Sequence, residues 1–97
     1  MSTIRTRVRF EQQGTRLTAV RIVRGRKLPA IASLHRVLFA LGIVVSSYHV
    51  RARPMRLVER IVIERRDGGS VDGQLTEDTK KAILPIVFEE VDNGVGS

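Results

Sequence analysis

Apolar and polar residues alternate from the start of the chain. Over residues 3–10, one face would carry Ile4, Thr6, Val8 and Phe10, and the other would carry Arg5, Arg7 and Arg9. A period of two is typical of a strand with one buried face. Residues 17–23 predict a second strand, with Ala19, Arg21 and Val23 on one face. The short turn at Gln12-Gln13-Gly14 predicts that these two strands form a hairpin.

The next stretch changes to a helical period. Pro29 suits the first turn of a helix, where its missing N–H is not needed, and Gly42 suits the position just after the last turn. The pattern therefore predicts a helix over residues 28–41 that lays one apolar stripe against the core. The stripe consists of Ile31, Leu34, Leu38 and Leu41.

Two more strands are predicted after this helix. Residues 43–50 and 56–66 are rich in β-branched residues, which favour strands. Residues 51–55 are expected to form a turn, because Pro54 interrupts the strand pattern there. Asp67-Gly68-Gly69 is expected to end the later strand in another turn.

A second helix is predicted near the C-terminus. Thr76 is expected to cap its N-terminus, and Pro85 falls on its solvent side, where it should kink the helix rather than end it. An alternative ends the helix at Leu84 and makes residues 86–91 a strand. Residues 92–97 are expected to form a frayed tail.

The order of these elements predicts an α+β fold, ββαββα, with an antiparallel sheet and two helices on one of its faces. The 97 residues suit a single domain over positions 1–97, with a core at about 3–91. The uncovered face of the sheet is expected to be partly apolar, which is typical of an interface. The residues expected there are Ala19, Val23, Val58 and Val62.

The composition narrows the possible locations. The chain has no Cys, so disulfides and Cys-ligated metal sites are ruled out, as is usual in a reducing compartment. The longest apolar run, residues 37–45, is too short to span a bilayer, and the first residues lack the apolar stretch of a signal peptide. We therefore expect a cytoplasmic protein that does not engage a membrane.

Positive charge is concentrated in the first two thirds of the chain. Residues 1–66 hold 15 Lys and Arg against 3 Asp and Glu, whereas residues 67–97 hold 2 against 7. A basic surface attracts anionic metabolites, acidic proteins or nucleic acid. The acidic end of the chain is also able to neutralise part of the basic body, within one chain or across a dimer.

The stretch LPAIASLHRVLFALGIVVSSYHV, residues 28–50, resembles the core of an ACT domain, in which a helix leads through Leu-Gly-Ile into a strand. Residues 57–63 and the Asp67-Gly68 turn resemble the third strand of that family and the turn after it. VRFEQQGTRLTAVRIV resembles the N-terminal hairpin of ACT domains in the nitrogen-sensing uridylyltransferase. The resemblance implies a ferredoxin-like ACT-type ββαββα fold, whose first strand takes the place of the usual last strand. It also implies regulatory binding of small molecules, pairing of domains and no catalytic residues.

The resemblance places an effector-binding candidate in the loop before the first predicted helix: Gly25, Arg26, Lys27, Leu28 and Pro29. Free N–H groups at a helix N-terminus attract anions. The loop is therefore expected to hold a carboxylate or phosphate, or else to be an ordinary solvated basic loop. The family usually has an acidic residue followed by Pro-Gly here, whereas this chain has basic residues and Pro29 in place of the glycine.

Arginines form the second candidate, an interface or anion-binding face of the sheet: Arg5, Arg7, Arg9, Arg51, Arg53, Arg56 and Arg60. Such a face could receive phosphates, meet a protein partner or solvent, or guard the strands against edge-to-edge aggregation. Sheets that read bases use aromatic platforms. With three Phe and one Tyr in the chain, nucleic acid is the less favoured partner.

No set of residues points to catalysis, a metal or a cofactor. His35 and His49 lack partners at metal-binding spacing, Ser46-Ser47 lacks the glycines of a nucleophile elbow, and the acidic residues around Asp67 suit turns and caps. The sequence predicts a non-enzymatic ACT-like regulatory or adaptor module that forms a homodimer or a higher oligomer, with the dimer favoured, and binds a small-molecule effector or an acidic protein. The alternative is a nucleic-acid-binding protein that uses the arginine-rich sheet face.

Overall fold

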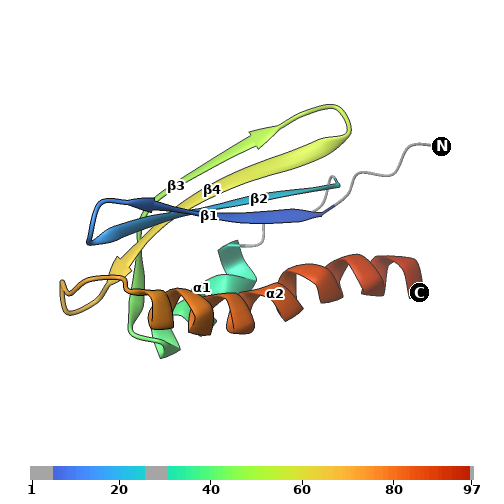
Figure 1. The fold of residues 1–97 in the computed structure, drawn as a ribbon. Helices are drawn as coiled ribbons and strands as arrows, with labels where there is room; N and C mark the ends of the chain where they lie inside the picture. The colour runs from blue at the N-terminus through green and yellow to red at the C-terminus, as the bar shows by residue number, and fades with distance from the viewer. Residues whose placement is uncertain (1–5, 26–30, 97) are drawn as a thin grey trace.

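The computed structural model describes residues 6–25 and 31–96, with side chains as far as Phe88. The elements are β1 (Arg7–Gln13), β2 (Leu17–Gly25), α1 (Ile31–Ala40), β3 (Ile43–Ala52), β4 (Arg56–Arg65) and α2 (Gly73–Gly96). Figure 1 shows two layers, with the strands in one layer and both helices against one face of the sheet. The predicted α+β class and antiparallel sheet are confirmed.

The strands lie in the order β1-β2-β4-β3, and all neighbours are antiparallel. β1–β2 and β3–β4 are hairpins, whereas β2 and β3 lie on either side of β4 and are connected through α1. Both β2 and β3 run antiparallel to β4, so they run parallel to each other. A connection between parallel strands needs a crossover, and α1 supplies it.

The core lies between the sheet and the helices. Its strand residues Val20, Ile22, Ile61 and Ile63 and its helix residues Leu34, Leu38, Ile83 and Val87 are all at most 2% exposed. Ile31 and Leu41 pack against the margin of this cluster. The apolar stripe predicted for the first helix is therefore confirmed.

A glycine and an aspartate define two helix ends. Gly42 follows α1 with a φ of +77°, and its N–H donates to the carbonyl of Phe39 at 3.0 Å. This left-handed conformation favours glycine.

The predicted cap of the second helix is wrong. α2 begins at Gly73, because Asp72 Oδ1 accepts the N–H of Leu75 at 2.8 Å, as an N-cap carboxylate does. Thr76 lies inside the first turn and donates its hydroxyl to the Asp72 carbonyl at 2.9 Å.

α2 continues through Pro85 to Gly96. Pro85 is exposed, which confirms its predicted place on the solvent side. Residues 86–91 belong to the helix, which excludes the alternative strand there. The backbone of residues 92–96, where the sequence predicts a tail, is also helical.

The hairpin turns are displaced from their predicted positions. Gln12 and Gln13 belong to β1, where they pair with Thr18 and Leu17, so the first turn starts at Gly14, whose φ is +84°. Ladder pairing extends each strand as far as a residue that favours a turn. In the same way β3 runs to Ala52, and the Arg53 N–H closes the second turn on the Arg56 carbonyl at 2.8 Å.

Candidate anion-binding face

The side of the sheet without helices is called the open face. Alternate residues of a strand point to opposite faces, so Arg21 and Arg60 lie opposite the core residues Ile22 and Ile61. The inner strands give this face the following residues: Leu17, Ala19, Arg21 and Val23 from β2, and Arg56, Val58, Arg60, Val62 and Glu64 from β4.

The strand register aligns basic side chains across the whole open face. Arg9 of β1 pairs with Arg21 of β2, Arg21 pairs with Arg60 of β4, and Arg60 pairs with His49 of β3. We call these four residues the arginine row. All four side chains are exposed. Neighbouring strands are about 4.8 Å apart, so the row extends over about 14 Å.

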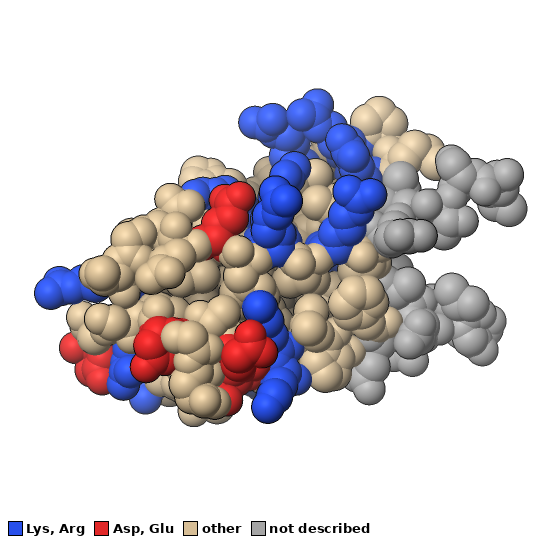
Figure 2. All heavy atoms as spheres, in the orientation of Figure 1, with Lys and Arg blue, Asp and Glu red and all other residues tan. Residues whose placement is uncertain are grey.

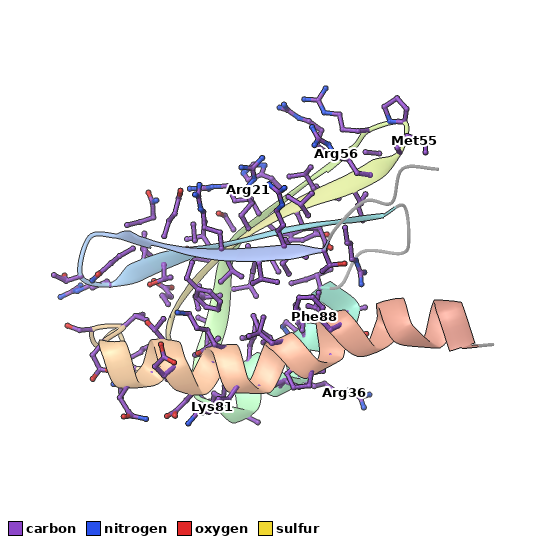
Figure 3. All side chains as sticks on the ribbon, turned by 45° about the vertical axis from the view of Figure 1, so that its right-hand side comes forward. Arg21, Arg36, Met55, Arg56, Lys81 and Phe88 are labelled. Atoms are coloured by element: carbon purple, nitrogen blue, oxygen red, sulfur yellow. The ribbon has the colours of Figure 1, made fainter. Side chains whose placement is uncertain are left out.

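Next to the row, the open face contains a hollow of about 400 Å³ on the β3–β4 side of the sheet. Its basic lining consists of Arg21, Arg51, Arg53, Arg56 and Arg60 together with His49. Figure 2 shows Lys and Arg side chains gathered over this part of the sheet. Figure 3 shows Arg21 and Arg56 projecting from the sheet on the side away from the helices.

Few negative charges balance these arginines within the described part of the chain. Arg9 Nη1 lies 4.0 Å from Glu11 Oε1, and both side chains are more than half exposed. No described carboxylate forms an ion pair with the arginines of the hollow, namely Arg21, Arg51, Arg53, Arg56 and Arg60. Like charges directly opposite each other on adjacent strands destabilise a sheet. An anion held between these arginines would relieve that repulsion.

The charges on the covered face are arranged differently. Arg24 of β2 and Glu59 of β4 are fully buried, with 3.9 Å between Nε and Oε2. Tyr48 of β3 donates its hydroxyl to Glu59 Oε1 at 2.9 Å. Burial raises the pKa of Tyr48 above its usual value, and the hydrogen bond to Glu59 and the Glu59 charge raise that pKa further. Here the charges are compensated inside the protein, as buried charges require.

Most arginines predicted from the sequence lie together on the open face. Arg9 and Arg60 belong to the row, and Arg7 lines up with Arg51 across Val23 and Val58. Arg51, Arg53 and Arg56 line the hollow, whereas Arg5 lies outside the described residues.

The sequence interpretation missed Arg21 and His49 as members of this face. The signal for Arg21 was available, because the alternation over residues 17–23 already placed it with Ala19 and Val23. His49 was not predictable in the same way, because a register shift between Val45 and Ser47 changes which residues of β3 share a face.

The sequence also predicts an effector loop and a partly apolar patch on the uncovered face of the sheet. Gly25 is the last residue of β2, opposite Arg56; the remainder of the effector loop, Arg26, Lys27, Leu28 and Pro29, lies outside the described residues. Ala19 pairs with Val62, and Val23 pairs with Val58, so these four share one face as predicted. However, Ala19 and Val62 are only 3% and 7% exposed. A partner on this face would therefore meet mainly arginines.

A second hollow, of about 320 Å³, lies beside the start of α2 and carries charges of both signs. Lys80 lies 3.4 Å from Glu77 there, so the basic group of this hollow already has a counter-charge. Asp72, which also lines it, caps the helix.

The histidines are on different layers, His35 on α1 and His49 on β3. Among the described residues, no three His, Cys, Asp or Glu side chains gather as a metal site would require.

No protein-family model, curated protein or solved structure matches this chain. In the described part of the chain, no helix combines the length and apolarity needed to cross a bilayer. The open face, with its arginine row and basic hollow, is therefore the feature from which a function can be inferred.

Proposed function

We propose that this chain is a non-enzymatic binding module that holds an anionic partner on its open face. The observation that supports the proposal is the arginine row, in which Arg9, Arg21 and Arg60 occupy paired positions on adjacent strands. Such a row lowers stability through like-charge repulsion. Residues that conflict with stability in this way are typical of functional sites. The planar guanidinium group also suits bidentate contacts with phosphate and carboxylate.

We further propose that the fold is ferredoxin-like and of the ACT type. The unit β2-α1-β3, with β4 inserted between its strands, has the arrangement of a split βαβ motif. β1 lies beside β2 and runs parallel to β4. In a ferredoxin-like fold, a last strand follows the second helix through a second crossover and occupies this position. Here β1 occupies the position instead. In this proposal, anion binding regulates the module by favouring one state of its assembly or one partner.

The homodimer expected from the sequence remains part of the proposal, but the open face does not suit self-association. Two copies placed face to face would bring like charges together, which disfavours the contact. The outer edges of β1 and β3 are the places where a second sheet could pair while leaving both open faces accessible. Light scattering on a concentrated sample would test this, since a strict monomer excludes the dimer without affecting anion binding.

Anion binding is tested with two variants that remove equal charge from opposite sides of the molecule. Arg21→Gln/Arg60→Gln changes the open face, and Arg36→Gln/Lys81→Gln changes the helix side, where Figure 3 shows both residues pointing away from the sheet. All four side chains are exposed, so both variants should fold.

Inorganic polyphosphate serves as the probe. A ligand that binds only the folded state raises the melting temperature. We therefore expect polyphosphate to raise the melting temperature of the wild type and the helix-side variant, and to have a much smaller effect on the open-face variant. An equal rise in both variants would show that net charge, and not the open face, governs binding.

A further inference from the structure

The open face also indicates which class of anion it receives. We infer that the partner is a double-stranded nucleic acid, bound through its phosphate backbone and independently of base sequence. This inference rests on the proposed function. The inference depends on the extent of the basic surface, the lack of Phe, Tyr and Trp side chains in its described part and the limited apolar area it offers.

The basic surface is longer than a single phosphate group. The arginine row crosses the sheet over about 14 Å, and Arg56 and Arg60 on β4 are separated along the strand by about 14 Å. One phosphate is bound bidentately by one guanidinium group, so a small anion would leave most of these arginines unused. A duplex carries one charge per about 1.7 Å of its axis, so it presents several phosphates over the length of the row.

The open face has no platform of Phe, Tyr or Trp in its described part. Phe10 and Tyr48 pack against the core cluster on the helix side, and Phe39 and Phe88 belong to the helices. Binding of single strands depends on stacking of bases on aromatic side chains. A surface of arginines without such side chains fits the backbone of a duplex, whose bases are already stacked and turned inward.

An acidic protein partner fits this face less well. The centre of a protein interface is usually apolar and poor in charge. Here Ala19 and Val62 are 3% and 7% exposed, and the half-buried Val23 and Val58 lie among arginines. The helix side differs as well, because the half-buried Lys80 is close to Glu77 and no comparable row lies among the described helix residues. The asymmetry predicts that the sheet, and not the helix layer, meets the duplex.

The test measures fluorescence anisotropy of labelled duplex DNA, duplex RNA and the corresponding single strands at several salt concentrations. We expect both duplexes, or one of them, to bind with an affinity that falls steeply with salt and does not depend on sequence. Arg21→Gln/Arg60→Gln should lower the duplex affinity about tenfold and reduce the salt slope by about two. Arg36→Gln/Lys81→Gln should leave both quantities close to those of the wild type.

The outcomes separate this inference from the proposed function. Single strands that bind as tightly as duplexes, or a duplex affinity that falls equally in both variants, would overturn the inference. If polyphosphate raises the melting temperature through the open face but no duplex binds, the anion-binding function stands and the inference is wrong. If neither polyphosphate nor duplex binds, both are wrong.

Discussion

Arg21 and Arg24 lie three residues apart on β2, but on opposite faces of the sheet. Arg24 is fully buried on the covered face beside Glu59, with 3.9 Å between Nε and Oε2. Arg21 is exposed on the open face, where it lies opposite Arg60 and no described carboxylate pairs with it. β2 therefore carries one positive charge that Glu59 neutralises inside the protein and a second that an external anion can reach.

The difference follows from the surroundings of the two charges. A buried guanidinium group loses its hydration, so the protein must provide a partner for the charge. An exposed guanidinium group keeps its water, so a row of such groups costs only modest repulsion. The covered face thus uses charge to fix the packing of β2 against β4, and the open face keeps charge for an external partner.

The largest expected effect comes from Glu59. Glu59→Gln removes the negative charge beside buried Arg24 and weakens the acceptor of Tyr48, so we expect the free energy of unfolding to fall by about 3–5 kcal/mol. Urea unfolding followed by circular dichroism measures this change. Glu64→Gln, on the open side of the same strand, is the control and should change stability by less than about 0.5 kcal/mol. Equal losses in the two variants would contradict the contrast between the faces.

A matched pair of valines gives the next effect. Val20 is 2% exposed on the covered face, whereas Val58 is only half-buried on the open face. Val20→Ala should destabilise the protein by about 2 kcal/mol through lost burial and a cavity. Val58→Ala should cost well under half as much in the same urea experiment. If Val58→Ala is the more damaging, the open face is a packed surface and not a free one.

High pH is expected to weaken the covered face through Tyr48. The folded protein raises the pKa of Tyr48, while in the unfolded chain Tyr ionises near pH 10. Above that pH the unfolded state loses a proton that the folded state retains. The contribution of Tyr48 to stability is therefore fully present below about pH 10 and falls by up to about 1.4 kcal/mol per pH unit above it. Tyr48 is the only Tyr, so tyrosinate absorbance reports its ionisation directly.

Tyr48→Phe provides the control for this pH dependence. The variant should lack the part of the alkaline loss that is due to Tyr48, although its stability at neutral pH is lower because the hydrogen bond to Glu59 is absent. An identical alkaline loss in the variant and the wild type would show that other groups cause it.

The smallest effect is a gain in stability. Arg21→Gln removes a charge that faces Arg9 and Arg60, so the free energy of unfolding should rise by about 0.2–1 kcal/mol at low salt and the gain should shrink as salt screens the row. Arg36→Gln, on the helix side, should show no such gain. A loss of stability in Arg21→Gln would indicate that the arginine takes part in packing.

Much of the fold could be predicted from local patterns. The spacing of Leu34 and Leu38, the position of Gly42 and the β-branched runs of β3 and β4 each follow from short-range chemistry. The start of α2 was predicted at Thr76 because threonine is a good cap, but Asp72 lies earlier and provides a carboxylate. Both residue types favour that position, so the sequence alone did not decide between them.

The candidate site depends on register, which is harder to predict. The sequence predicted an arginine face, but the row requires Arg9, Arg21 and Arg60 to be paired across three strands. The displaced hairpin turn sets the pairing of β1 with β2, and the register shift in β3 brings His49 opposite Arg60. Neither is encoded in a local pattern. Burial of Arg24 and Glu59 was equally hidden, because both look like ordinary solvent-facing residues in the sequence.

The most direct test of the arginine row as an anion-binding site is a double-mutant cycle between Arg21 and Arg60. The free energy of unfolding is measured for the wild type, Arg21→Gln, Arg60→Gln and the double variant, with and without inorganic polyphosphate. We expect a repulsive coupling between the two arginines without polyphosphate, and a coupling near zero or attractive when polyphosphate is bound. A coupling that is the same in both conditions would contradict the claim that this row exists to hold an anion.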